Sequence, residues 1–327
     1  MWLTSSSVGR KLIMALTGAC LVLFLTFHVL MNAVAILWPG AYNQICAFLG
    51  ANWYALIASA GLGLLFVIHI IYALILTFQN RKARGNDRYD LTSTPKSVEW
   101  SSQNMLVLGI VIVAFLAVHM VQFWYKMQWQ EIWGHWYADA QGATIPAAAG
   151  TLFIQLAFQD WWTPVLYIVG FVALWFHLNH GIWSMFQSAG WSNKTWLPRL
   201  KTVACWWTSI VVGLFVVQAL WFTYEASNKT YLTDEALNQQ YFEMYQEELQ
   251  KEMIELQKSA GDFNPEVQKE AEKIYRQSLR SIKTYAPTSF EKLGIPEEQL
   301  QEPVENVNNA VETPKADENV VLEDSIN

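Results

Sequence analysis

The sequence predicts an all-α fold, a transmembrane bundle of five helices followed by a C-terminal acidic helical extension. Hydrophobic residues make up 53% of the 327 residues and charged residues only 15%, against about 25% charged in an average soluble domain. Five apolar segments each reach the roughly 20 residues that a bilayer span needs. Residues 1–224 carry 11 Lys+Arg and 6 Asp+Glu, whereas residues 225–327 carry 10 and 22. The acidic charge therefore belongs to the part of the chain that follows the last apolar segment.

The predicted spans are separated by polar or aromatic connections. Pro39-Gly40 ends the first span, and we expect a polar loop to about Asn52. The first span is too long for the apolar core of a signal peptide, so we expect it to be retained. A basic loop follows the second span, and a long aromatic-rich loop at 129–162 follows the third. The five spans are predicted at 12–38, 53–78, 101–127, 163–189 and 202–224.

Lys and Arg residues predict how the bundle is oriented. Ten of them lie in the N-terminal segment and in the second and fourth connections, whereas the first and third connections hold only Lys126. Basic connections stay on the cytoplasmic side of a membrane. The N-terminus is therefore expected in the cytoplasm, and five spans place the C-terminal tail outside.

The tail divides into two predicted parts. Residues 225–300 form an amphipathic helical extension, because apolar residues recur at steps of three and four along 233–258. Asn264-Pro265 is a typical N-cap and first-turn pair for a second helix that ends near Tyr285. The two helices are expected to form a hairpin. Residues 301–327 are acidic, contain no aromatic residue and are predicted to be disordered.

The cysteines and the charge pattern exclude some functions. Cys20, Cys46 and Cys205 lie far apart, and the chain has no Cys-x-x-Cys motif. This spacing argues against an iron–sulfur cluster or zinc site within this chain. Nothing in the charge pattern indicates nucleic-acid binding.

Four predicted spans each carry a histidine at a depth that pairs it with one other. His28 lies 18 residues past Arg10 and His119 lies 19 past Trp100, which is roughly 27–29 Å from the cytoplasmic end. His69 and His177 lie 12 and 13 residues from the same end, or roughly 18–20 Å. Haem iron takes two axial imidazoles from opposite sides. The pattern predicts a two-haem membrane cytochrome b.

Structural readings of the same residues remain open. A single histidine in a membrane helix can also hydrogen-bond a neighbouring helix, and the glycines near these histidines suit close helix packing as well as a cofactor. His180 follows His177 by three residues and cannot bind the same iron from the same helix. It is expected to hydrogen-bond a propionate or loop residue, or to pack. His135, in an aromatic loop, is expected at the interface and not as a ligand.

Four segments together resemble a known family. They are FHVLMNAVAILWPGAYN, FVIHIIYALILTF, FLAVHMVQFW and FHLNHGIWSMFQSAGW. They resemble the ligand helices of the five-helix, two-haem cytochrome b anchor of succinate dehydrogenase and fumarate reductase complexes. The last segment is similar to that family's FH-x-x-x-G-[LI]-W-S pattern. The resemblance covers residues 5–224 and makes His177, not His180, the fourth ligand.

The resemblance implies a function and partners. His69 and His177 would hold the proximal haem b, and His28 and His119 the distal haem b. The chain would anchor a flavoprotein with covalent FAD and an iron–sulfur subunit on the cytoplasmic side of a bacterial inner membrane. It would pass electrons between the iron–sulfur subunit and a quinone, usually menaquinone. The flavoprotein, not this chain, would act on succinate or fumarate.

The chain departs from some members of that family. Trp175 stands where some members have a Glu linked to proton movement, so that proton route is not expected here. The first connection carries Tyr42, Asn43 and Gln44 where some members have a carboxylate near the quinone. The resemblance therefore assigns no quinone pocket.

Two other functions remain as alternatives. The first is a two-haem anchor of another quinone-linked enzyme, such as a hydrogenase or formate dehydrogenase. The second is a transporter or scaffold without haem. The lack of acidic residues along a pathway in the predicted spans argues against the transporter.

Overall fold

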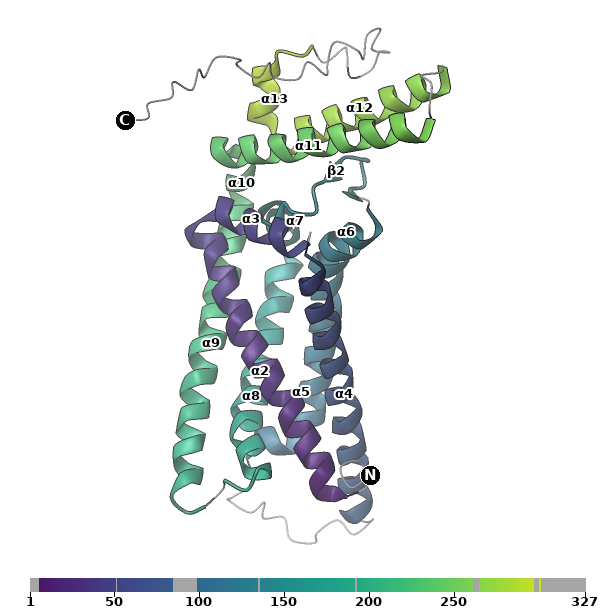
Figure 1. The fold of residues 1–327 in the computed structure, drawn as a ribbon. Coiled ribbons are helices and arrows are strands. Elements are labelled where there is room, and N and C mark those ends of the chain that lie inside the picture. The colour runs from purple at the N-terminus through teal and green to yellow at the C-terminus, as the bar shows by residue number, and fades with distance from the viewer. Residues whose placement is uncertain are drawn as a thin grey trace, which may run out of the picture.

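The computed structural model describes residues 6–50, 52–84, 99–134, 136–191, 193–260, 265–296 and 300. Long helices run side by side in a bundle, and further helices lie across one end of it (Figure 1). The elements are α2 (Ser7–Leu37), α3 (Pro39–Gly50), α4 (Trp53–Arg84), α5 (Trp100–His119), the π-helix η1 (Met120–Trp129), α6 (Gln130–Trp133), β1 (Tyr137–Ala138), β2 (Thr144–Ile145), α7 (Gly150–Gln159), α8 (Trp162–Ser188), α9 (Trp196–Ser227), α10 (Thr230–Thr233), α11 (Glu235–Ala260), α12 (Pro265–Tyr285) and α13 (Pro287–Leu293).

Among the described residues, five helical stretches are long and apolar enough to cross a membrane. They coincide with the five predicted spans and are Ser7–Leu37, Trp53–Ala83, Trp100–Trp133, Trp162–Ser188 and Trp196–Ser227. Large apolar side chains such as Leu23, Val107 and Trp206 are exposed on them, as expected for surfaces that meet lipid. The predicted fold class, an all-α transmembrane bundle, is confirmed, and the chain is a multi-pass membrane protein.

Helix α8 lies at the centre of the bundle. It packs against α2, α5 and α9, and α2 packs in turn against α4 and α9. Helix α4 lies at an edge, and no residue in its most apolar stretch is buried. The bundle is therefore tight around α8 and α9 and loose around α4.

Local sequence sets the ends of these helices. The Ser6 hydroxyl accepts a hydrogen bond from the Gly9 amide at 3.0 Å and caps the start of α2. Gly190 has a φ of 86° and follows the end of α8. The amides of Trp191 and Gly190 donate to the carbonyls of Phe186 and Gln187, at 3.0 and 3.1 Å. This pattern is a Schellman motif, and its left-handed position favours glycine.

Two connections predicted as loops contain regular structure. The first, expected as a polar loop from residue 39 to about 52, forms α3. The long connection at 129–162 contains α6, the two-stranded antiparallel β1–β2 sheet and α7. Helix α7 is buried along most of its length. These helices escape a search for amphipathic or spanning segments because they are short and are held by neighbouring elements: α7 packs mainly against α9, and α3 mainly against α2.

The C-terminal extension packs on this end of the bundle. Asp234 caps α11 by accepting a hydrogen bond from the Leu237 amide at 2.9 Å, and α11 and α12 lie side by side across the bundle (Figure 1). Pro265 begins α12 and Tyr285 ends it, so the predicted hairpin is present. The expected N-cap Asn264 and the tail 301–327 lie outside the described residues.

A polar network joins the extension to the bundle. The buried amide of Asn43 donates to Gln240 at 3.0 Å and accepts from the backbone and hydroxyl of Thr151 at 3.0 and 2.8 Å. The Thr151 hydroxyl also meets the Tyr241 hydroxyl at 2.7 Å. Tyr241 and Tyr245 are fully buried in the same hydrophobic cluster as residues of α7, α8 and α9. The extension therefore completes the core at one end of the bundle, which we call the tail side; the opposite end is the loop side.

Candidate functional site

The four predicted histidines form two pairs inside the bundle. The ring centroids of His28 on α2 and His119 on α5 lie 5.8 Å apart. Those of His69 on α4 and His177 on α8 lie 6.4 Å apart. His69 contacts Thr17, which lies on α2 eleven residues before His28. The His69–His177 pair is therefore the loop-side pair, about 16 Å along α2 from the tail-side pair of His28 and His119.

Hydrogen bonds fix the orientation of the tail-side pair. The Tyr167 hydroxyl donates to Gln122 Oε1 at 3.0 Å, and Gln122 Nε2 donates to Thr163 at 3.1 Å. The Tyr167 oxygen lies 3.0 Å from His119 Nδ1. Because the only hydroxyl hydrogen is already donated, Tyr167 accepts from Nδ1–H. His119 Nε2 then carries the free lone pair that a metal requires.

Aromatic rings surround the same pair. Phe24 stacks on His28 at 5.3 Å and Phe215 lies 6.0 Å from it. Phe115 and Phe123 lie 5.9 and 5.2 Å from His119. Asn32 Nδ2 lies 3.5 Å from His28 Nε2, one turn along α2. That separation is at the outer limit of a hydrogen bond, so Asn32 leaves His28 Nε2 weakly engaged.

The loop-side pair has a comparable arrangement. The Thr17 hydroxyl donates within α2 to the carbonyls of Ile13 and Met14, at 2.9 and 3.1 Å. Its oxygen therefore accepts from His69 Nδ1, which lies 3.1 Å away. A Cβ on Gly18 would lie 3.4 Å from the His69 ring, so glycine leaves room beside the imidazole. His177 Nδ1 is buried without a hydrogen-bond partner.

The spacing of each pair fits one metal ion held between two imidazoles. Imidazole nitrogens bind first-row metals at about 2 Å, which places two ring centroids about 6 Å apart on opposite sides of the ion. In the described part of the chain, α4 and α8 make few if any close backbone contacts, and the same holds for α2 and α5. The two imidazoles of each pair thus meet across helices that are not packed tightly against each other.

His180 lies in a separate polar cluster at the loop side. Its Nδ1 is 3.3 Å from Glu99 Oε2, and Glu99 Oε1 accepts from Lys201 at 2.6 Å. The Lys201 ammonium also lies over the Trp183 ring at 4.4 Å. Burial raises the pKa of Glu99, but the hydrogen bonds from Lys201 and His180 outweigh it and hold this pKa below its ordinary value. His180 therefore bonds a residue of the connection before α5.

Sequence patterns did not indicate several residues that contact the histidines. Thr17, Tyr167 and Glu99 come from other helices or lie far along the chain from the histidine that they contact, and Gln122, three residues after His119, reaches it through Tyr167. Thr17 lies eleven residues before His28, which places it near the depth of His69, so residue counting could have indicated this one contact. Trp175 donates to the Ser209 hydroxyl at 3.0 Å and is not part of either pair. His135 lies outside the described residues.

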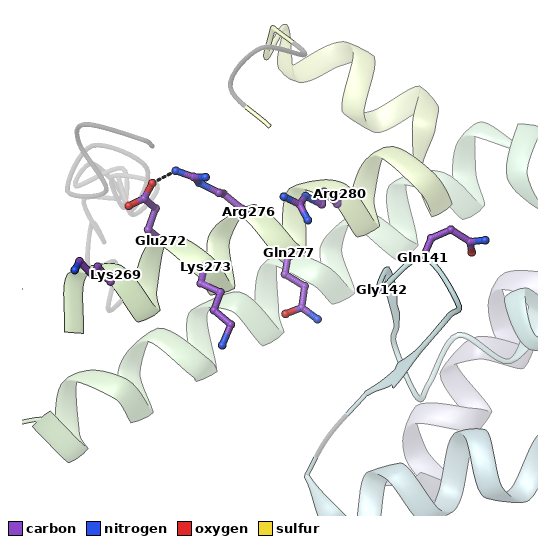
Figure 2. A pocket seen from close by; sticks show the side chains of 8 residues that line it. All are labelled: Gln141, Gly142, Lys269, Glu272, Lys273, Arg276, Gln277 and Arg280. Carbon is purple, nitrogen blue, oxygen red and sulfur yellow. Dashed lines mark hydrogen bonds and ion pairs between the residues drawn. The ribbon is translucent and has the colours of Figure 1, made fainter. Parts of the chain in front are cut away.

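A surface hollow far from the histidines lies between α12 and the turn at Gln141 and Gly142 (Figure 2). Its volume is about 510 Å³. Arg276 pairs with Glu272 in its wall, and the Nε of Arg276 is buried without a hydrogen-bond partner. Its lining is the solvated face of α12: Lys269, Glu272, Lys273, Arg276, Gln277 and Arg280.

Taken together, the fold and the histidine geometry define a multi-pass helical membrane protein with two partly buried imidazole pairs at two depths. Comparison with known proteins adds no family to this class. No protein-family model, no curated protein and no solved structure matches the chain.

Proposed function

We propose that the chain is the two-haem cytochrome b anchor of a succinate dehydrogenase or fumarate reductase complex. His69 and His177 would hold one haem b, and His28 and His119 the other. The chain would carry electrons between an iron–sulfur subunit and a quinone, usually menaquinone. This proposal joins the resemblance of residues 5–224 with the geometry of the histidine pairs.

One observation carries the haem assignment. Each pair brings imidazoles from two different helices to the separation that a shared metal ion requires, at 5.8 and 6.4 Å between centroids. Histidines with a purely structural role would each hydrogen-bond a neighbouring helix and would not need to face a second imidazole. Here His69 and His119 use Nδ1 for such a bond, which keeps Nε2 for a metal.

When bound, haem supplies reversible one-electron transfer, and the chain supplies its position. Thr17 and Tyr167 orient one imidazole in each pair by accepting a hydrogen bond from its Nδ1–H. The rings of Phe24, Phe115 and Phe123 lie against the imidazoles of the tail-side pair. An apolar shell of this kind limits the access of water and so influences the redox potential of a bound metal.

The charge distribution supports one orientation. In the described part of the chain, eight Lys and Arg residues belong to the loop side, and such residues stay in the cytoplasm. We therefore place the loop side and the N-terminus in the cytoplasm, where the flavoprotein and iron–sulfur subunits would dock. The extension covers the tail side, which leaves the loop side as the face for those partners.

A pyridine haemochrome assay on the purified chain tests the haem assignment. We expect two b haems per chain, and a preparation without a Soret band would refute the proposal and favour a transporter or scaffold. The other quinone-linked enzymes would give the same spectrum. Co-purification of a subunit with covalent flavin separates the succinate or fumarate enzyme from a hydrogenase or formate dehydrogenase.

A further inference from the structure

A basic stripe runs along the face of α12 that lines the hollow beside the turn at Gln141 and Gly142 (Figure 2). Its members are four, three and four residues apart, and this spacing places them on one face of a helix. Glu272 is the one carboxylate among the described residues that line the hollow. The stripe consists of Lys269, Lys273, Arg276 and Arg280. It is a positive surface on a part of the chain, residues 225–327, that carries 22 Asp+Glu and only 10 Lys+Arg.

The described residues compensate only half of the basic stripe. Lys273 and Arg276 each form an ion pair with a glutamate three or four residues earlier on α12. In the described part of the chain, no ion pair joins Lys269 or Arg280 to a carboxylate. Both of these side chains are exposed, so each can take a carboxylate partner from a segment that lies over the hollow.

Residues 301–327 carry the complementary charge. They contain seven Asp+Glu and one Lys, which leaves an excess of six negative charges. They contain no aromatic residue, so ion pairs are a more available interaction for them than burial in a core. Their negative charge is sufficient to neutralise the two basic side chains of the stripe that have no carboxylate partner among the described residues.

Leu300 anchors the start of this acidic segment. It lies seven residues after the end of α13, and α13 packs on α12. Its side chain is buried in the hydrophobic cluster that also contains Leu279 and Ile282 of α12. The basic stripe extends over about 17 Å of helix at a rise of 1.5 Å per residue, whereas the 27 residues of 301–327 can span about 90 Å when extended. The segment is therefore tethered to the extension and long enough to follow the whole stripe.

Tethering favours this segment over a free anion. A flexible tether gives an effective concentration on the order of mM, which a free anion must match in solution to compete. A single exposed ion pair is weak and is screened by salt, so a stable contact on an exposed face needs several carboxylates at once. The acidic segment supplies them on one chain, whereas a phosphate group binds at one point.

We propose that the acidic segment 301–327 binds along the basic stripe of α12 and fills the hollow, with Lys269 and Arg280 taking carboxylate partners from it. The segment then covers the positive surface of the extension and excludes other anions from it. The contact lies on the tail side and uses neither histidine pair, so it does not depend on the haem proposal.

Carbodiimide cross-linking of the full chain in detergent tests the contact, because this reagent joins an ammonium to a carboxylate that lies against it. Mapping by mass spectrometry should find Lys269 joined to carboxylates of 301–327 at low ionic strength. These cross-links should fall several-fold at about 1 M salt, where the Debye length is about 3 Å. Lys229, an exposed residue before α10, is the control and should form few of them. Equal cross-linking of Lys229 and Lys269, or none at Lys269, would overturn the proposal.

Charge reversal gives a second measurement on the same face. The rate at which a Glu-specific protease releases fragments of 301–327 reports how well the segment is covered. Lys269→Glu combined with Arg280→Glu should raise this rate about 5–10-fold, the effect of losing two exposed ion pairs. Lys269→Arg combined with Arg280→Lys keeps both charges and should match the wild type, as should the control Lys229→Glu. Equal rates in the charge-reversed variant and the wild type would contradict the contact.

Two further measurements distinguish other occupants of the hollow. Cross-links between isotope-labelled and unlabelled chains, mixed before the reaction, would show that the segment comes from a second copy and would refute the contact within one chain. Phosphatidylglycerol added at equal ionic strength should leave the Lys269 cross-links unchanged, as should phosphatidylcholine. Loss of the cross-links with phosphatidylglycerol alone would identify a site for an anionic lipid headgroup and would refute the proposal as well.

Discussion

The hydroxyl of Tyr167 on α8 accepts a hydrogen bond from the Nδ1–H of His119 on α5 at 3.0 Å, because its own hydrogen is donated to Gln122. This bond selects the imidazole tautomer whose Nε2 can bind a metal. Thr17 does the same for His69 from α2, at 3.1 Å. One residue of each pair is thus oriented by a hydroxyl from a different helix.

Replacing Tyr167 should weaken the tail-side haem selectively. Tyr167→Phe removes the hydroxyl that accepts the hydrogen bond from His119 Nδ1–H. Loss of such a partner typically lowers metal affinity by about 10–100-fold. Haem retention during dialysis against apomyoglobin, followed by the Soret band, measures this. Thr17→Val should instead release the loop-side haem, and Tyr224→Phe, on an exposed ring, should release neither. Equal loss of both haems in Tyr167→Phe would contradict the assignment.

The two histidines of α8 should behave differently. His177→Ala should leave one haem per chain, because the loop-side pair loses a ligand, whereas His180→Ala should keep both. The pyridine haemochrome assay gives the stoichiometry. His180 bonds Glu99 and not another histidine, so a lost haem in His180→Ala with two haems in His177→Ala would show that the ligands are misassigned.

Gly170 should tolerate no side chain. A Cβ at this position would lie 2.6 Å from Cγ of Phe115, a ring that itself contacts His119. Overpacking of this kind costs about 1–3 kcal/mol. Gly170→Ala should therefore lower the midpoint of thermal unfolding in detergent. A Cβ at Gly213 on α9 would meet nothing within 4 Å, so Gly213→Ala is the matched control, and an equal fall in both variants would exclude the Phe115 clash as the cause.

The Glu99 cluster should stabilise the protein at neutral pH and not in acid. The folded pKa of Glu99 lies below its ordinary value of 4.5. Its stabilising contribution is therefore complete above that value and is lost as the pH falls through the lowered folded pKa. Glu99→Gln should reduce the thermal midpoint at pH 7. The difference from the wild type should shrink as the pH falls below 4.5, the ordinary pKa of a glutamate.

Lys201→Met provides the comparison for that prediction. Lys201 donates the shortest hydrogen bond to Glu99, at 2.6 Å, so its loss should remove much of the same pH dependence. A wild-type advantage over Glu99→Gln that stays constant between neutral and acid pH would contradict the role of the ionised carboxylate.

Local sequence was sufficient to predict the spanning helices and the helical hairpin of the extension. Long apolar segments must form helices in a bilayer, because every backbone polar group needs an internal partner there. The start of α12 at Pro265 follows from the fixed φ of proline. The short helices α3 and α7 were not predicted, because their stability comes from tertiary packing, mainly on α2 and α9, and not from their own pattern.

The sequence alone also placed the four histidines at two depths, because depth in a helix follows from residue count. Only the tertiary structure decided which side chains surround them. Thr17 and Tyr167 reach the imidazoles from other helices, and Gln122 holds Tyr167 in place. Contacts of this kind depend on the rotation of each helix about its axis, which packing fixes and residue spacing does not.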